Sequence, residues 1–314
     1  MAMHIDTPLV HSLGLSRISG REIWLKLDAL QASGSFKLRG MGHACQTYHA
    51  RGARRFISSS GGNAGLAVAY AGRHLGVAVR VVVPESTSAQ AIALLRQEGA
   101  EVMVHGISWQ EANALAQSMV GPTDAFLHPF DDPLLWAGHA SLIDEVHRSG
   151  LCPDVVVLSV GGGGLLSGVV EGLQRHAWRD VPVLGVETWG AESFHRSVQA
   201  NQVVELEQIS SVAKSLGAKR VCDQALACTR IHPIQSVVVS DHDAVSACRR
   251  FLDDHRLLVE PACGASLSLA YAAHPALLPY KKVLMVVCGG ATCTLDGLLD
   301  DCARTAIAEG MNDA

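Results

Sequence analysis

One lysine, Lys37, lies in a short segment of small and apolar residues, 33–40, directly after the aromatic ring of Phe36. An amine in a confined, partly dry site loses part of its preference for the charged form. The neutral amine can attack a carbonyl carbon and form a Schiff base. The segment therefore predicts covalent amine chemistry at Lys37. The alternative is a solvated lysine in a Gly/Ser loop.

Four consecutive glycines, Gly161–Gly164, follow an apolar run that ends at Val160 and precede a helical pattern that begins at Leu165. Glycines after a strand and before a helix let backbone N–H groups converge on an anion, which the helix dipole also favours. The segment lacks the Gly-Lys-Ser/Thr of a Walker loop and the GxGxxG fingerprint. It predicts a phosphate site, with an ordinary tight turn as the alternative.

Two further segments place polar groups after predicted strands. The loop 58–65 offers hydroxyl and N–H groups that could hold a carboxylate, and its Asn63 could donate a hydrogen bond to a phenolate oxygen. An ordinary helix N-cap is the alternative there. Cys288 ends an apolar run and precedes two glycines. It could face the ring nitrogen of a cofactor or be a small core residue.

The composition limits the function classes. The chain has 314 residues, 48% hydrophobic and 18% charged, with a net charge of −5. This balance argues against nucleic-acid and acidic-membrane partners, and we see neither a membrane-spanning apolar run nor a secretory signal. Nine cysteines without a CxxC pair indicate free thiols in a reducing compartment, for which we predict the cytoplasm. The fifteen histidines show no metal-ligand spacing.

Apolar runs alternate with helical patterns along the chain. Strands are predicted at 55–57, 77–83, 101–104, 154–160, 181–186, 236–239 and 283–288. Helices are predicted at 88–98, 108–119, 165–173 and 240–254, and Ser108 with Glu111 forms a capping box. This alternation is typical of parallel sheets covered on both faces. We therefore expect two α/β lobes with a ligand between them, at the carboxyl ends of strands.

Together these segments resemble the fold type II pyridoxal phosphate enzymes, and among them the serine dehydratase branch of the serine/threonine dehydratase family. The resemblance runs from Thr7 to about Leu298. Its most specific segments are SGSFKLRG at 33, SSSGGNAG at 58, HPFDDPLLWAGHAS at 128, SVGGGGLLSGVV at 159, ETWGAESFH at 187, SVAKSLGAK at 211, LVEPACGAS at 258 and VVCGG at 286.

The resemblance implies an α/β fold like that of tryptophan synthase β, with two doubly wound lobes and mainly parallel sheets. A large cofactor-binding domain would comprise residues 1–40 and 139–314, and a small domain residues 41–138. Family likeness also suggests a homodimer.

The resemblance further implies roles for individual residues. Lys37 would be the Schiff-base lysine and, with Ser60, a catalytic residue. Pyridoxal phosphate would be held by Phe36, Lys37, Asn63, Gly161, Gly162, Gly163, Gly164, Leu165 and Cys288. The substrate would be held by Ser60, Gly61, Asn63, Ala64 and Phe130. A monovalent cation such as potassium would bind the side chains of Glu187 and Ser193 and the carbonyls of Gly161, Ala191, Leu216 and Ala218, since oxygen ligands suit a hard cation.

The implied reaction is deamination of a small hydroxylated amino acid. Lys37, displaced from the cofactor aldehyde by the substrate amine, would remove the Cα proton, and the β-hydroxyl would leave as water. L-Serine would give pyruvate and ammonia, and L-threonine 2-oxobutanoate and ammonia. A neutral Cys288 thiol would favour this elimination over transamination or racemisation, whereas a thiolate would act more like a carboxylate. The sequence leaves the protonation of Cys288 and the preferred amino acid open.

Position 61 separates this chain from relatives that racemise serine, in which a serine there supplies a second base. Gly61 has no side chain, so we expect weak racemase activity, a slightly roomier pocket, and more racemisation in Gly61→Ser. Two alternative functions stay open at this point. One is a β-replacement synthase of the cysteine synthase type. The other is a non-catalytic protein that binds pyridoxal phosphate.

Overall fold

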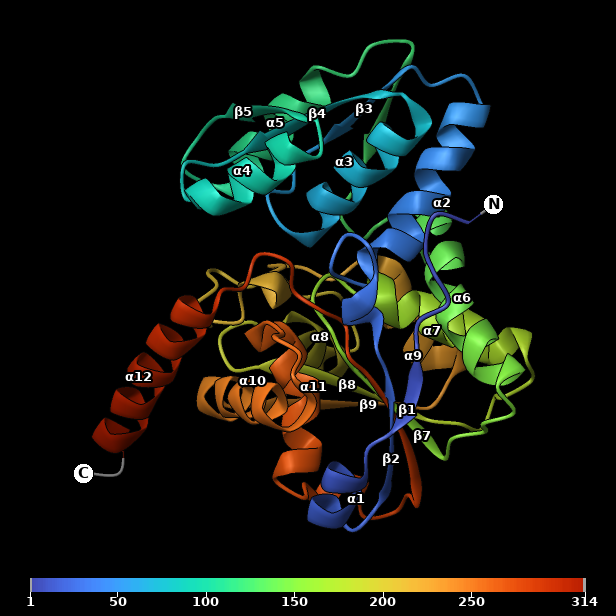
Figure 1. The fold of residues 1–314 in the computed structure, drawn as a ribbon, viewed down its shortest axis with the longest axis vertical. Coiled ribbons are helices and arrows are strands. Elements are labelled where there is room, and N and C mark those ends of the chain that lie inside the picture. Colours follow the sequence, from blue (N-terminus) through green and yellow to red (C-terminus); the bar gives the residue numbers. More distant parts are fainter. Residues whose placement is uncertain (1, 313–314) are drawn as a thin grey trace.

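The apolar runs of the chain form two separate β-sheets in the computed structural model, which describes residues 2–312 (Figure 1). The larger sheet has the strand order β1-β2-β10-β7-β8-β9. Its neighbouring strands pair in parallel, except that β1 is antiparallel to β2. The strands are β1 (Leu9–His11), β2 (Glu22–Lys26), β7 (Val155–Ser159), β8 (Val183–Thr188), β9 (Ile234–Val239) and β10 (Lys282–Val286).

Helices cover both faces of this sheet, which explains why β7 and β8 are buried along their whole length. Figure 1 places α10 and α11 on one side and α6, α7 and α9 on the other. The helices of this lobe are α1 (Leu13–Ser19), α6 (Pro133–Arg148), α7 (Gly164–Arg175), α8 (Ser193–Ala200), α9 (Asp223–Ile231), α10 (Asp241–His255), α11 (Pro261–Tyr271) and α12 (Leu295–Asn312). Short 3-10 turns are η1 (Asp28–Leu30), η2 (Lys214–Leu216) and η3 (Pro275–Leu277).

The smaller sheet is parallel and has the order β5-β4-β3-β6. Its strands are β3 (Arg55–Ser58), β4 (Ala78–Val83), β5 (Glu101–Val104) and β6 (Asp124–Leu127), and its helices are α2 (Lys37–Ala50), α3 (Asn63–Leu75), α4 (Ala89–Gln97) and α5 (Trp109–Ser118). Successive strand residues point to opposite faces. Phe56 therefore packs in the core with α2 and α3, whereas Ile57 packs with Ala112 and Ala116 of α5.

The predicted fold class, two α/β lobes with mainly parallel sheets, is confirmed, and individual elements deviate for local reasons. Strand β8 begins at Val183 and not at 181, because Pro182 has no N–H for the ladder and contributes only its carbonyl, to Val156. The capping box at Ser108 is only half formed. Ser108 accepts from the Glu111 N–H at 3.3 Å, but the Glu111 carboxylate accepts from Ile107 and not from Ser108.

The proposed domain limits at 40/41 and 138/139 both fall inside helices, α2 and α6, and they stay predictions. Helices α2 and α6 pack against each other and connect the two lobes (Figure 1). Within the described residues, no helix combines the length and the apolar character that crossing a membrane requires. Most segments that carry predicted site residues follow the carboxyl ends of β3, β6, β7, β8 and β10. The lysine segment instead follows β2 and η1, and Leu216 and Ala218 lie at or just after η2.

Candidate active site

Lys37 is the first residue of α2, and the end of β10 holds the turn that precedes it. The Phe36 N–H donates to the Cys288 carbonyl at 3.0 Å, and Ser35 forms a β-bridge with Gly289. A Cβ on Gly289 would lie 2.4 Å from the Gly34 carbonyl oxygen, so only glycine allows this approach. The segment VVCGG therefore positions the lysine, a connection between residues more than two hundred positions apart.

The Lys37 amine has a carbonyl partner and no carboxylate in hydrogen-bond contact among the described residues. Its Nζ donates to the Pro129 carbonyl at 2.5 Å and lies 5.1 Å from the centre of the Phe36 ring. Burial lowers the pKa of Lys37 to about 8, although the nearby Glu260 charge opposes this. Roughly a tenth of such an amine is neutral at pH 7, which is the form that attacks a carbonyl carbon.

The glycine loop between β7 and α7 has the form of an anion cradle. Among the described residues, the N–H groups of 161–166 have no hydrogen-bond acceptor, and the helix dipole of α7 favours negative charge there. Side chains would block the loop. A Cβ on Gly163, whose φ is +89°, would lie 2.4 Å from the Ala225 Cβ, and one on Gly161 would lie 2.9 Å from the Ser215 carbonyl oxygen. The unpaired donors fit a phosphate group.

Phe130 lies directly on this glycine loop. A Cβ on Gly162 would be 2.1 Å from the Phe130 ring, and the Phe130 carbonyl accepts from the Trp136 indole at 2.9 Å. Because Pro129 contacts Lys37, the segment 129–130 joins the lysine to the loop. The predicted contact of Phe130 with substrate stays a prediction.

Cys288 lies just beyond β10 and is 5% exposed. A hydrogen bond with the Cys263 thiol, followed by burial, raises the pKa of Cys288 well above that of an ordinary thiol. The structure thus favours the neutral thiol over the thiolate that the sequence left open.

Helix α3 begins at Asn63 after an N-cap glycine, Gly62, and no side chain caps it. The segment 58–65 thus does contain a helix N-cap, but its hydroxyl groups do not cap the helix. The Asn63 Nδ2 donates to Glu260 Oε1 at 2.8 Å, and its Oδ1 accepts from the Ala291 N–H at 3.1 Å. Within the described chain, the N–H groups of residues 63–65 have no acceptor, so they can receive a carboxylate together with Ser60.

The space around Gly61 is smaller than the sequence indicates. A Cβ at this position would lie 2.7 Å from the Thr87 Cγ2 and 3.2 Å from the Val83 Cγ1. A serine at 61 must therefore displace Thr87, so the substitution carries a packing cost in addition to any chemical effect.

Four of the proposed cation ligands lie at or just after the ends of β7 and β8, and Leu216 and Ala218 lie at or just after η2. Glu187 is buried, its carboxylate accepts the N–H groups of Phe194 and His195 at 2.8 and 2.7 Å, and burial raises its pKa to about 8. The buried Ser193 hydroxyl has no hydrogen-bond partner. An oxygen-rich, desolvated set of this kind fits a monovalent cation. Clusters of three or more His, Cys, Asp or Glu able to hold a metal are absent from the described residues.

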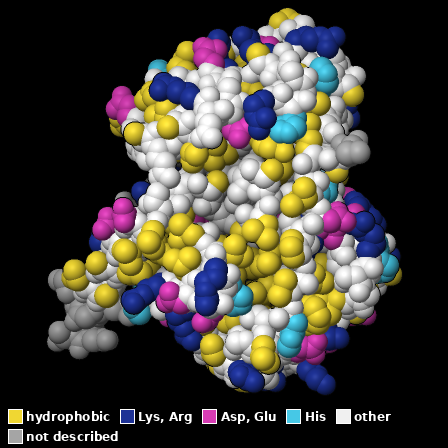
Figure 2. All heavy atoms as spheres, in the orientation of Figure 1, with side chains coloured by type: hydrophobic (Ala, Val, Ile, Leu, Met, Phe, Trp, Pro, Cys, Tyr) yellow, Lys and Arg dark blue, Asp and Glu magenta, His cyan; other side chains and the backbone are white. Residues whose placement is uncertain are grey.

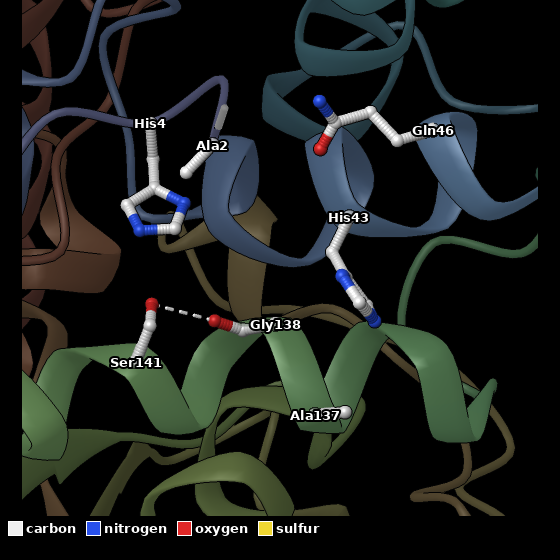
Figure 3. Close-up of a pocket in the computed structure, with 7 residues that line it drawn as sticks. All are labelled: Ala2, His4, His43, Gln46, Ala137, Gly138 and Ser141. Atoms are coloured by element: carbon white, nitrogen blue, oxygen red, sulfur yellow. Dashed lines mark hydrogen bonds between the residues drawn. The ribbon is translucent and has the colours of Figure 1, made fainter.

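The surface view agrees with a site between the lobes. Figure 2 shows a narrowed waist between the upper and lower lobes, lined in this view mainly by backbone and uncharged polar atoms. A separate hollow of about 350 Å³ lies between the N-terminal segment, α2 and α6 (Figure 3). Its lining, which includes His4, His43 and Ser141, contains none of the predicted site residues.

Sequence reasoning missed Glu260, which contacts Asn63 at 2.8 Å and Ser215 at 2.9 Å. It also missed Gly290, where a Cβ would lie 2.5 Å from the Cβ of Glu260. A signal for Glu260 existed, because an acid directly before a helix-starting proline in the apolar segment LVEPACGAS needs a buried partner.

Comparisons with known proteins agree with this geometry. The family described as "Pyridoxal-phosphate dependent enzyme" matches residues 2–289. The chain is 46% identical over 304 residues to a human L-serine dehydratase/L-threonine deaminase, covering 93% of both chains. It is 48% identical over 298 residues to a human serine dehydratase-like protein, covering 91% of this chain and 90% of the relative.

Among solved structures, an L-serine ammonia-lyase from Rhizomucor miehei superposes with a TM-score of 0.92 at 35% identity, covering 97% of this chain and 100% of the other. The family match, these identities and the two-lobed fold agree with one another. The chain belongs to the fold type II pyridoxal-phosphate-dependent enzymes, in their serine dehydratase branch.

Proposed function

We propose that the protein is an L-serine ammonia-lyase that converts L-serine to pyruvate and ammonia, and that it also converts L-threonine to 2-oxobutanoate and ammonia. The main support is the Lys37 amine, whose pKa is lowered by burial. The segment 129–130 connects this amine to a glycine loop whose N–H groups are unpaired. The names and coverage of the relatives support this substrate class.

Pyridoxal phosphate, when bound, supplies an aldehyde and an electron sink for bond changes at the substrate Cα. In our proposal the N–H groups of the glycine loop and Leu165 would bind its phosphate, and Phe36 would pack on its ring. Asn63 would donate to its 3-oxygen. Cys288, as a neutral thiol, would be the group for the ring nitrogen, and it would stabilise a ring proton less than a carboxylate.

The remaining groups act on the substrate. Lys37 takes the proton from Cα, and Ser60 with the N–H groups of residues 63–65 binds the carboxylate. Because Gly61 has no side chain, there is no second base at this position. Prompt loss of the β-hydroxyl is therefore favoured over racemisation.

We also propose that potassium binds Glu187 and Ser193 with the carbonyls of Gly161, Ala191, Leu216 and Ala218. The unpartnered Ser193 hydroxyl and the desolvated Glu187 carboxylate support this. Ser215 and Leu216 lie against Gly161, so the ion would brace the phosphate loop. Exchange of potassium for a large organic cation should lower activity, and unchanged activity would remove the site from the proposal.

The test of the function is a keto-acid assay with L-serine, L-threonine and their D-forms. We expect turnover of the L-forms, with pyruvate from L-serine. A second mixture, O-acetylserine with sulfide, tests the β-replacement alternative. Cysteine formed in excess of pyruvate would overturn the lyase assignment.

Two finer properties belong to the same proposal. The cytoplasm is supported by the nine cysteines, all of which are free thiols in the structure. A homodimer is supported by the resemblance to the family. A sedimentation mass of one chain at micromolar concentration would contradict the dimer, and disulfides in protein isolated from its native cells would contradict the reducing compartment.

A further inference from the structure

Glu260 is a buried carboxylate that none of the roles above uses. It precedes α11 as its N-cap residue and is 7% exposed. Its N–H donates to the Gly289 carbonyl at 3.3 Å, and its carbonyl accepts from the Cys248 thiol at 3.1 Å. Gly290 permits the close approach of Glu260 to the end of β10. The main chain of Glu260 is therefore fixed at the point where the lysine turn and β10 meet.

The Glu260 carboxylate connects the two lobes. Oε1 accepts from the Asn63 Nδ2 of the smaller lobe at 2.8 Å, and Oε2 accepts from the Ser215 hydroxyl of the larger lobe at 2.9 Å. The Asn63 Oδ1 accepts from Ala291, also in the larger lobe. Both polar atoms of the Asn63 side chain are thus held by residues across the junction.

These partners define which way the Asn63 amide faces. The Ala291 N–H can only donate, and an ionised Glu260 can only accept. A reversed amide would put two donors together on one side and two acceptors together on the other. In the observed orientation one Nδ2 hydrogen goes to Glu260, and the second remains available.

We propose that Glu260 is a positioning residue that holds the Asn63 amide in the orientation that leaves one N–H for the 3-oxygen of pyridoxal phosphate. This inference rests on the proposed function, because it assigns that N–H to the cofactor. Glu260 itself acts through Asn63.

The charge of Glu260 depends on its surroundings. Burial raises its pKa to about 7, while Ser215, Asn63 and the Lys37 charge act in the opposite direction. The other titratable groups whose charge couples to it are the thiols of Cys248, Cys288 and Cys293. A protonated Glu260 could donate and would no longer oppose a reversed amide, so only the Ala291 N–H would then favour the observed orientation. Cofactor affinity should therefore weaken as the pH falls below about 7.

The test is a double-mutant cycle on cofactor affinity, measured by fluorescence as apoenzyme is titrated with pyridoxal phosphate. Glu260→Gln and Asn63→Ala should each weaken binding about ten-fold, roughly the value of one hydrogen bond. If Glu260 acts through Asn63, Glu260→Gln should have almost no further effect in the Asn63→Ala background. Equal effects in both backgrounds would overturn the proposal.

Glu260→Asp is the second variant, because it keeps the charge but withdraws the carboxylate by one methylene. It should lose as much affinity as Glu260→Gln, and wild-type affinity would contradict the proposal even if the Gln variant failed to fold. The matched control is Ser215→Ala, which removes the other partner of the same carboxylate and should weaken binding less than about three-fold. Wild-type protein that binds the cofactor without deaminating serine would instead overturn the proposed function alone.

Discussion

Two lysines of this chain, one buried and one half-buried, have different partners. Lys26, in β2, is 1% exposed, donates to the Thr7 carbonyl at 2.6 Å and contacts the Glu145 carboxylate. Arg39 bonds the same Glu145 and also Asp28, at 2.7 Å, so two cations face two carboxylates. Within the described chain, the Lys37 amine has only the Pro129 carbonyl as a hydrogen-bond partner.

This difference shows which of the two lysines can do chemistry. An amine that contacts a carboxylate forms an ion pair and serves the fold. An amine that contacts only a carbonyl is desolvated without an ion-pair partner, and burial lowers the pKa of Lys37 to about 8 although the nearby Glu260 charge opposes this. Glu260 is close enough to influence Lys37, but its oxygens are bound to Asn63 and Ser215. The arrangement thus keeps a carboxylate near the amine without pairing it.

The largest expected effect is on turnover. Lys37→Ala should lower deamination of L-serine by about 1,000-fold or more, because the group that takes the Cα proton is gone. Borohydride trapping followed by mass spectrometry should label position 37 in the wild type only. Far-UV circular dichroism of the variant checks its fold. Activity within ten-fold of wild type would assign the chemistry elsewhere.

Lys26→Met should have its effect on folding. The substitution leaves two buried carboxylates with only one cation, which should lower the free energy of unfolding by about 3–5 kcal/mol. Urea denaturation of the apoprotein measures it. Lys26→Met/Glu145→Gln restores the balance of one cation to one carboxylate and should recover part of the loss. If Lys26→Met leaves the free energy of unfolding unchanged, the two lysines do not differ as we describe.

The same substitution at the other lysine should act in the opposite direction. Lys37→Met removes a desolvated, unpaired charge, and we expect the apoprotein to gain about 1 kcal/mol at pH 7, a value reduced because the side chain partly faces solvent. Below pH 8 both folded and unfolded chains carry the proton and the gain is complete. As the pH rises from about 8 to about 10.5, the wild type folds with the neutral amine and the gain should disappear. A loss of stability at pH 7 would contradict this.

The smallest effect is a difference in titration. Reductive methylation with ¹³C-labelled formaldehyde, followed by NMR of the apoprotein, should show a lysine resonance that titrates near pH 8 beside that of the α-amine, and Lys37→Ala should lack the lysine resonance. Ordinary lysines titrate at about 10.4. If no resonance is lost from this pH range in the variant, the lysine environment is not as the structure indicates.

The local patterns predicted much of the architecture. Strand β5 has the predicted limits, and α4 and α10 begin after Ser88 and Ser240, whose side chains cap them. These features depend on near neighbours in the chain, so periodicity and capping residues reveal them. The glycine loop was predictable for the same reason.

The contacts across the site were not predictable in this way. The Phe36–Cys288, Asn63–Glu260 and Asn63–Ala291 hydrogen bonds join residues about two hundred or more positions apart. No local pattern specifies such a pair, because it depends on how the two lobes pack. The close contact that a side chain at position 61 would make with Thr87 also follows from packing, and no local pattern predicts it.

The sequence by itself determined the alternation of strands and helices, the glycine loop, the lysine segment and, through its resemblance, the family. The tertiary structure alone decided which of the two lysines has carboxylate partners, that the Cys263 contact and burial raise the pKa of the Cys288 thiol, and that Glu260 lies beside Asn63. The physical reason is that desolvation and hydrogen bonding depend on which side chains meet in space. Residue type and spacing along the chain specify the groups that are present, but not the partners that fix their charge.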